Sequence, residues 1–214
     1  LNQRQAHAYC PEFIWLNEAK FDLPGNDDGQ RQQYTHDLFT GFALNFIRRN
    51  QEKPFFLYVP YAVPHTKFEV PDLGPYTDKD WNEDEKVYAT MITRMDRDVG
   101  KMLSLLKECG IDENTVVFFC SDNGAANRYD HLFKSSGVLR GRKRDMTEGG
   151  IRTPMVVRWP GEIAAGRENE SPWSFADFLV TAADLAGAEG SGPTNGVSVV
   201  PTWQGQSQPE LRDR

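Results

Sequence analysis

Long apolar runs are missing from this chain of 214 residues. Its apolar stretches are far shorter than the roughly 20 residues that a membrane-spanning helix needs, so we expect no membrane span. A basic excess is also missing, because 31 acidic side chains outnumber 24 basic ones and give a formal charge of −7. Proteins that bind nucleic acids generally carry a basic surface, so we expect no nucleic-acid partner.

Cysteine and the common nucleophile motifs are scarce as well. Cys10, Cys109 and Cys120 lack the spacing of a zinc site, and we expect them to be buried packing thiols. The sequence contains no G-x-S-x-G elbow and no Walker A motif. These absences exclude the corresponding serine hydrolases and P-loop nucleotide-binding enzymes, and they leave no obvious nucleophile.

Helical and strand patterns nevertheless alternate along the chain, whose 39% hydrophobic content is typical of globular proteins. The patterns predict helices at 35–50, 83–109 and 174–187, and buried strands at 55–59, 114–121 and 154–161. Such alternation favours an α/β fold with a mostly parallel sheet flanked by helices. The expected division is an irregular segment at 1–31, an α/β domain at 32–190 and a polar tail at 191–214.

Two of the helices carry clear signals. In the first, Leu38, Phe42 and Phe46 share one face, which we expect to be buried. In the second, Asn82 is a plausible N-cap with Glu85 three residues later. The third predicted helix starts at Ser174 and ends at a glycine.

Polar side chains follow two of the predicted strands, where ligands of parallel α/β sheets bind. Asp122 and Asn123 come directly after the strand at 114–121. Their hard oxygen atoms suit Ca²⁺ or Mg²⁺, although two side chains cannot complete a calcium shell. Asp-Asn-Gly is also a common turn sequence, so the residues alone leave both interpretations open.

His65 and Lys143 are the other candidates. His65, after the first strand, could bind an anion or pass a proton to a leaving oxygen, or be an ordinary histidine. Lys143 lies among three arginines within positions 140–144, where cations could hold a tetrahedral dianion or form a solvated face. The Glu-Gly-Gly sequence at 148–150 predicts a tight turn into the next strand.

Three blocks in order carry a resemblance: "KPFFLYVPYAVPHTKFEVP", "YATMITRMDRDVGKMLSLLKECGIDENTVVFFCSDNG" and "LRGRKRDMTEGGIRTPMVVRWPGEI". Together they resemble the type I, formylglycine-dependent sulfatases of the arylsulfatase A and N-acetylgalactosamine-6-sulfatase type, in the alkaline-phosphatase-like superfamily. The resemblance implies part of an alkaline-phosphatase-like sandwich, with 32–190 as the second half of the catalytic domain. It also implies hydrolysis of aryl or sugar sulfate esters and an extracytoplasmic location (periplasmic, secreted or lysosomal).

The resemblance further implies roles for four residues. Asp122 and Asn123 match two ligands of the family's Ca²⁺ ion, and Lys143 matches its sulfate-binding lysine. His65 matches the histidine that contacts the sulfate or protonates the leaving alcohol. Residues that select the alcohol are expected in the loops 66–80 and 125–138; weak candidates there are Tyr129, His131 and Lys134.

The sequence departs from the family pattern at the nucleophile. No cysteine or serine stands in the Cys/Ser-x-Pro/Ala-x-Arg motif from which formylglycine is made, and the family's upstream Asp-Asp pair, which completes the calcium shell, is also missing. We therefore expect these residues to be a middle-to-late segment of a sulfatase whose partner is the remainder of its own chain. Alone, the segment is expected to be inactive and to bind Ca²⁺ weakly.

Two other functions remain open at this stage. A phosphatase or phosphodiesterase of the same superfamily would bind zinc through histidine and aspartate, but only four histidines occur, and the pair Asp130-His131 lies in a loop and not at a strand end. A non-catalytic domain that binds sulfated sugars would also fit His65 and Lys143. The metal of the full protein and the presence of a formylglycine motif distinguish these alternatives.

Overall fold

The computed structural model describes residues 7–126, 128–188 and 192–208. Contacts divide the chain into two compact units, which are described separately below. The first unit comprises Leu1–Asp112 and Asn123–Thr153, and the second comprises Glu113–Asp122 and Pro154–Arg214. Residues 1–6 of the predicted irregular segment and residues 209–214 of the predicted polar tail lie outside the described residues.

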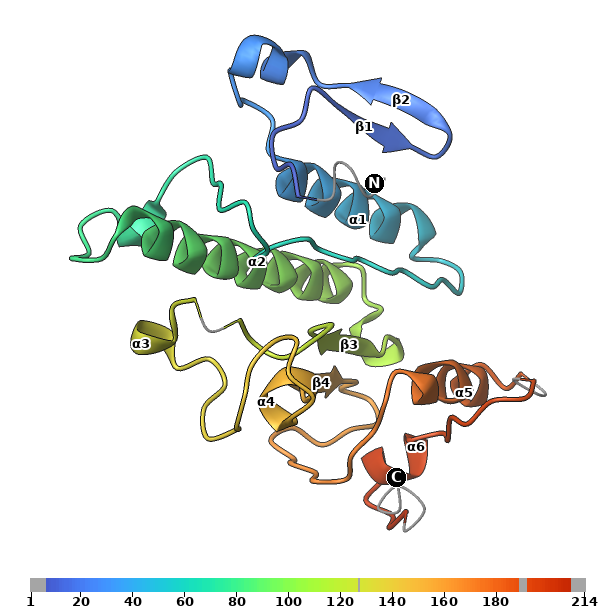
Figure 1. The fold of residues 1–214 in the computed structure, drawn as a ribbon. Helices are drawn as coiled ribbons and strands as arrows, with labels where there is room; N and C mark the ends of the chain where they lie inside the picture. Colours follow the sequence, from blue (N-terminus) through green and yellow to red (C-terminus); the bar gives the residue numbers. More distant parts are fainter. Residues whose placement is uncertain (1–6, 127, 189–191, 209–214) are drawn as a thin grey trace. The chain divides into compact units, whose positions relative to one another are not determined.

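The first unit is mainly helical (Figure 1). Its elements are β1 Phe13–Leu16, β2 Ala19–Asp22, η1 Pro24–Gly29, α1 Thr35–Asn50, η2 Gly74–Tyr76, α2 Glu83–Glu108, α3 Asp130–Phe133 and α4 Glu148–Ile151. Its core cluster consists of Tyr9, Tyr34, Val63 and Met91.

A β-hairpin lies inside the segment that the sequence predicted to be irregular. Strands β1 and β2 pair antiparallel, from Phe13 opposite Asp22 to Leu16 opposite Ala19. Asn17 turns the chain with a φ of 54°, a conformation that asparagine adopts more readily than most residues. The available signal was therefore an apolar run ending at an asparagine turn.

Helix α1 begins and ends where the sequence predicted, but a different face of it is buried. The buried residues include His36, Thr40 and Ala43, whereas Phe42 of the predicted apolar face is 39% exposed. Hydropathy alone misplaced this face because His36 and Thr40 are polar. Both are buried because they bond to a carboxylate on α2.

That carboxylate, Asp98, forms a buried polar network between the two helices. His36 Nε2 lies 3.1 Å from its Oδ2, and Lys101 Nζ lies 2.6 Å from its Oδ1. Burial by itself would raise the pKa of Asp98, but hydrogen bonds from Arg97 and Lys101 outweigh it and hold the pKa below its usual value. Burial lowers the pKa of His36. Neutral His36 therefore donates its Nε2 proton to ionised Asp98.

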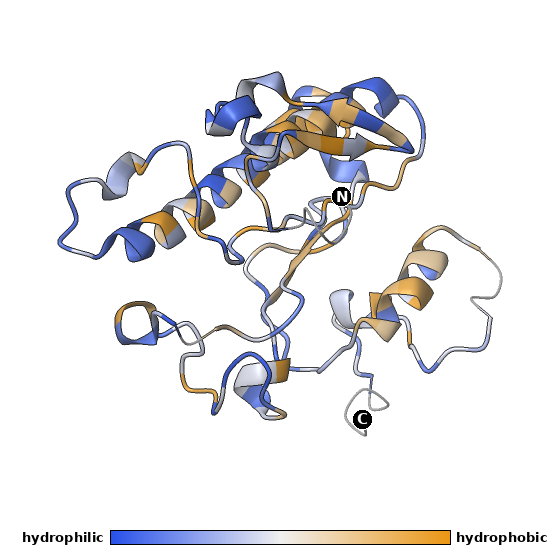
Figure 2. Ribbon diagram, turned by 45° about the horizontal axis from the view of Figure 1, so that its top comes forward, coloured by the Kyte–Doolittle hydropathy of each residue, from blue (hydrophilic) through white to orange (hydrophobic). Residues whose placement is uncertain are grey.

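Helix α2 confirms the predicted start and stop signals. The Asn82 side chain accepts from the Glu85 backbone, and the Glu85 side chain accepts in return from the Asn82 backbone, which completes a capping box. Gly110 follows the helix with a φ of 69°, the left-handed conformation of a C-terminal stop. Hydrophilic and hydrophobic colours follow one another along α2 in Figure 2. Its buried apolar residues include Met91, Leu105 and Leu106.

The segment 55–59 is not a strand in the structure, contrary to the prediction. Its residues alternate between half-buried and exposed, with Phe56 and Tyr58 exposed by 70% and 74%. Phe55 packs on Phe46 of α1 with ring centroids 5.8 Å apart. The segment therefore uses one side to cover α1, and it does not join either of the strand pairs in the described part of the chain.

The second unit contains β3 Val117–Cys120, β4 Met155–Arg158, α5 Ala176–Leu185 and α6 Val200–Trp203. The short η3 Asp112–Asn114 spans the sequence boundary between the first and second units. Strands β3 and β4 lie inside two predicted strands but pair antiparallel, with Cys120 opposite Met155. The intervening loop leaves and returns at the same end of the pair, which forces this direction. Within the described residues both strand pairs are antiparallel, so the parallel sheet remains a prediction.

Helix α5 begins two residues later than the predicted cap at Ser174. The Asp177 side chain still accepts from the Ser174 backbone at 2.7 Å, and its other oxygen accepts from Val197 N at 2.9 Å. Asp177 is fully buried, so this carboxylate fixes the segment before α6 against α5. Gly187 ends the helix region with a positive φ of 63°, as expected. None of the described helices is both long enough and apolar enough for a membrane span.

Candidate functional site

The segment after β3 and the basic loop pack together in the first unit. Lys143 N donates to Ala125 O at 2.8 Å, and Gly124 N donates to Gly150 O at 2.9 Å. Gly149 N also donates to Arg140 O at 2.8 Å. These main-chain bonds place the Lys143 backbone next to the segment that begins with Asn123. The structure therefore brings these two predicted site residues onto neighbouring segments.

Glycines make this close packing possible. A Cβ atom on Gly124 would overlap the carbonyl oxygen of Gly149, and a Cβ atom on Gly150 would overlap the carbonyl oxygen of Asp145. The glycines of the Asp-Asn-Gly and Glu-Gly-Gly sequences thus have a packing reason beyond turn formation. Instead of a simple tight turn, the second sequence begins the short helix α4.

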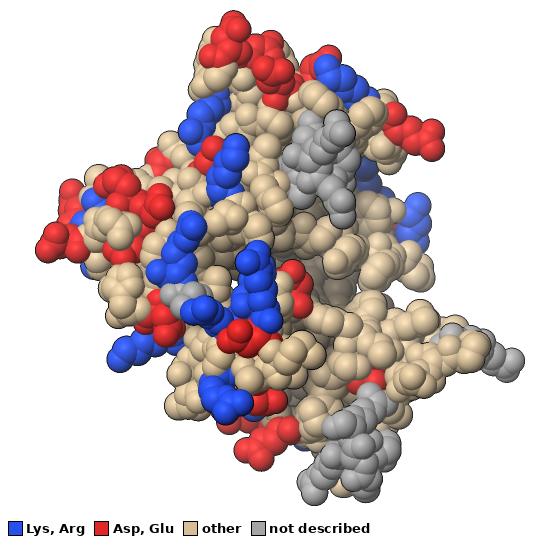
Figure 3. Space-filling view, viewed as in Figure 1, with Lys and Arg blue, Asp and Glu red and all other residues tan. Residues whose placement is uncertain are grey.

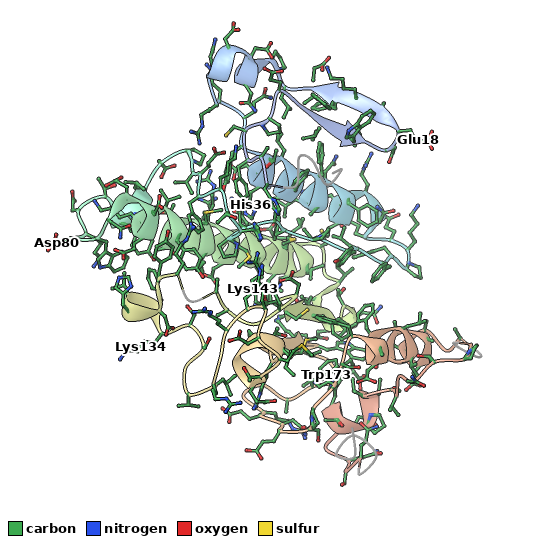
Figure 4. All side chains as sticks on the ribbon, viewed as in Figure 1. Glu18, His36, Asp80, Lys134, Lys143 and Trp173 are labelled. Atoms are coloured by element: carbon green, nitrogen blue, oxygen red, sulfur yellow. The ribbon has the colours of Figure 1, made fainter. Side chains whose placement is uncertain are left out.

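Lys143 differs from its basic neighbours in burial. Arg140, Arg142 and Arg144 are exposed, whereas Lys143 is half-buried. Figure 4 labels Lys143 on the stretch between α3 and α4. On the face drawn in Figure 3, basic side chains lie interspersed with acidic ones. No carboxylate in the described part of the chain forms an ion pair with the Lys143 ammonium, so this cation is available to an anionic ligand.

His65 lies at the end of a turn in the first unit. Its backbone N–H donates to Ala62 O at 3.0 Å, and its carbonyl accepts from the Tyr9 hydroxyl at 2.8 Å. The ring atom Nδ1 lies 2.8 Å from Thr66 O. A carbonyl only accepts, so Nδ1 carries the proton and Nε2 is the nitrogen left for chemistry in the neutral ring. The ring also stacks on His7, a contact that no sequence signal indicated.

Asp122 is exposed, one residue beyond Ser121 and β3, and is grouped with the second unit. Its carboxylate and the Asn123 amide have the oxygen chemistry that Ca²⁺ prefers. In number they fall short of a shell of six to eight ligands. Among residues 7–126, 128–188 and 192–208, no three His, Cys, Asp or Glu side chains form a group that could hold a metal. The donors present fit part of a calcium site.

The structure therefore places the four predicted residues in three settings. Asn123 and Lys143 share one packed loop region, and His65 occupies a separate turn of the same unit. Asp122 ends the strand region of the other unit. Their assembly into one site remains a prediction.

The weak candidates for contacts with the alcohol differ in availability. Tyr129 is buried among rings, 5.6 Å from Phe68 and 5.3 Å from Tyr88 between centroids, so it is a packing residue. His131 Nε2 lies 2.7 Å from a carboxylate oxygen of Glu85, which ties it to the start of α2. Only Lys134 of the three is both exposed and outside these contacts.

The cysteines are less buried than predicted. Cys10 and Cys109 are half-buried, and Cys120 is exposed. The prediction of buried packing thiols was wrong because β3 presents Cys120 at its more exposed end. Partial burial still raises the pKa of the Cys10 and Cys120 thiols, which disfavours the reactive thiolate.

Comparison with known proteins identifies the family. Residues 3–188 match the protein family described as Sulfatase. An arylsulfatase of Hemicentrotus pulcherrimus is 39% identical over 175 residues, which is 82% of this chain and 30% of the relative. An N-acetylgalactosamine-6-sulfatase of Canis lupus familiaris is 39% identical over 148 residues, or 68% and 27% of the two chains. The chain belongs to the sulfatase family.

A solved structure supports the same assignment. The protein Ps i-CgsB, crystallised in complex with k-i-k-neocarrahexaose, superposes with a TM-score of 0.75 at 30% identity. The match covers 90% of this chain and 42% of that protein. This structural similarity agrees with the predicted alkaline-phosphatase-like fold, whereas the mostly parallel sheet of that prediction is not shown. It spans about a third or less of the length of the curated relatives named above.

Proposed function

We propose that the protein to which these residues belong hydrolyses sulfate esters, with Lys143, His65, Asp122 and Asn123 contributing to the site. The observation that carries the proposal is the family match over 3–188, which includes all four residues. The packed loop that brings Lys143 beside the Asn123 segment supports it. The relatives named above act on different alcohols, so the proposed substrate class is the sulfate ester.

Lys143 binds the sulfate group in this proposal. Its ammonium is half-buried and has no carboxylate partner among the described residues, so it can approach an anion without first breaking an ion pair. Partial removal from water strengthens the attraction between the ammonium and the ester oxygens. Negative charge grows on those oxygens as the ester bond breaks, so the lysine stabilises the transition state more than the ground state.

His65 supplies the proton for the departing alcohol. With Nδ1 held by the Thr66 carbonyl, Nε2 is the atom that takes up a proton and donates it to the leaving oxygen. The turn that carries the ring is held by the Tyr9 hydroxyl, so the imidazole sits on a fixed backbone. Protonation of the alkoxide removes the charge that would otherwise slow bond cleavage.

Asp122 and Asn123 would hold a calcium ion together with further ligands that complete its coordination shell. When bound, the ion supplies Lewis-acid polarisation of the sulfate group. The chain provides no residue in a formylglycine motif, so the 214 residues alone are proposed to be inactive. Extracytoplasmic action is also proposed, and it is supported by the family resemblance alone.

The test uses the full natural polypeptide that contains these residues, with 4-nitrophenyl sulfate as substrate. Lys143→Ala is expected to lower kcat/KM by about 10²–10³-fold, the usual cost of removing one donor to a developing negative charge. The matched control is Arg142→Ala, an exposed cation one position away, which should stay within about threefold of wild type. Equal losses in both variants would contradict the role of Lys143.

A metal exchange separates the rival enzyme class. After chelation, Ca²⁺ should restore sulfate-ester hydrolysis, whereas Zn²⁺ with cleavage of 4-nitrophenyl phosphate would identify a phosphatase or phosphodiesterase. A protein that binds sulfated sugar but turns over neither ester would indicate the non-catalytic alternative.

A further inference from the structure

Two histidines far apart in the sequence stack their rings in the first unit. The centroids of the His7 and His65 rings lie 4.1 Å apart, and the ring planes are inclined by only 8°. His7 is exposed and His65 is half-buried, so His7 covers one face of the deeper ring. Nearly parallel rings at this distance are in van der Waals contact and restrict each other's rotation.

The segment that carries His7 also holds the backbone of His65. Two residues after His7, the Tyr9 hydroxyl lies 2.8 Å from His65 O and 3.1 Å from Ala62 O. Burial raises the pKa of Tyr9 above its ordinary value, so the hydroxyl remains protonated and donates. Tyr9 O in turn accepts from Thr35 N at 2.8 Å, at the start of α1. One short segment therefore fixes both the backbone and the ring of His65.

The orientation of His65 is constrained at two points of its ring. On one edge, Nδ1 donates to Thr66 O at 2.8 Å. On one face, the ring contacts His7. The edge contact alone is a single hydrogen bond, which rotation of the ring would break, and the stacking contact opposes that rotation. Together the two contacts hold the ring in one tautomer and fix the direction in which Nε2 points.

We propose that His7 is a positioning residue that stacks on His65 and fixes the direction in which Nε2 delivers its proton to the leaving alcohol. This inference rests on the proposed function, because it assigns His7 to the same reaction. His7 acts through the ring of His65 and requires no contact with the substrate. An aromatic ring at position 7 is the property that matters.

The test compares two apolar replacements of similar bulk in the full natural polypeptide. His7→Phe keeps a ring that can stack, whereas His7→Leu does not. With 4-nitrophenyl sulfate, His7→Leu should lower kcat by roughly 10- to 100-fold, the cost of a displaced catalytic group, with KM within about threefold of wild type. His7→Phe should restore kcat to within about threefold of wild type. Equal kcat values for the two variants would overturn the proposal.

A second measurement reads the ring directly and does not depend on turnover. The ¹⁵N chemical shifts of the His65 ring nitrogens should report a single Nδ1–H tautomer in wild type and His7→Phe, and a mixture in His7→Leu. An unchanged tautomer in His7→Leu would overturn the positioning role even in an active enzyme. Absence of turnover by the wild type, with the tautomer shift present, would instead refute the proposed function and leave the positioning of His65 intact.

Discussion

Replacement of Asp98 by asparagine should strongly destabilise the packing of α1 on α2. The side chain of Asp98 is 1% exposed and receives hydrogen bonds from His36, Thr40, Arg97 and Lys101. Asparagine has nearly the same shape but only one acceptor oxygen. The NH2 of the asparagine would therefore face hydrogen-bond donors, either those of His36 and Thr40 or those of Arg97 and Lys101.

The magnitude follows from which partners lose their bond. Removing one partner of a fully buried ion pair costs about 3–5 kcal/mol. The Arg97 and Lys101 side chains are each 48% exposed, so water can solvate them once the carboxylate is gone. We therefore expect a loss of about 2–3 kcal/mol in the free energy of unfolding, mainly from the buried donors left without an acceptor. For a chain of this size that corresponds to roughly 4–12 °C in Tm.

Urea denaturation followed by circular dichroism at 222 nm is a suitable assay, because α1 and α2 supply 16 and 26 helical residues. The matched control is Asp96→Asn, an exposed carboxylate two positions away on the same helix. The control should change the free energy of unfolding by less than about 0.5 kcal/mol. If Asp98→Asn were as stable as Asp96→Asn, the network would not hold the helices and the reasoning would fail.

Two further predictions concern pH and glycine. Burial lowers the pKa of His36, so the unfolded chain binds this proton more readily and the free energy of unfolding should fall as pH drops below about 6.5. His36→Gln, which keeps a donor without titrating, should flatten that slope in urea denaturation between pH 5.5 and 7.5; an unchanged slope would refute the assignment. Gly124→Ala should cost about 1–3 kcal/mol because its Cβ would overlap Gly149 O, whereas Gly100→Ala, in open space on α2, should gain up to about 1 kcal/mol. If the Tm values of Gly124→Ala and Gly100→Ala moved in the same direction, this pair of glycine predictions would be contradicted.

The long helices α1 and α2 were predictable because their signals are local. The Asn82 and Glu85 capping box and the Gly110 stop each lie within a few residues of the boundary that they set. The buried face of α1 was not predictable in this way. His36 and Thr40 are buried because of Asp98, 62 and 58 positions away, and no periodicity within α1 reports a partner at that separation.

The strands show the same limit in another form. Hydropathy located β3 and β4, but the direction of their pairing depends on where the loop between them returns. Apolar composition at 55–59 indicated a strand equally well, yet that segment packs Phe55 on α1 and is not assigned as a strand. A short apolar run indicates that a segment is at least partly buried. Whether the segment forms a strand depends on the element that packs against it.

The candidate site combines both kinds of information. The residue types of Asp122, Asn123, His65 and Lys143 were visible in the sequence, whereas the grouping of Lys143 with the Asn123 segment depends on how closely two loops approach. That approach is made by main-chain bonds from Lys143 N to Ala125 O and from Gly124 N to Gly150 O, and a side chain at Gly124 would overlap Gly149 O. The position of Lys143 is therefore set by backbone packing. Under the proposed role of Lys143, an alanine at Gly124 should consequently impair sulfate binding as well as stability, although Gly124 has no group of its own to offer a ligand.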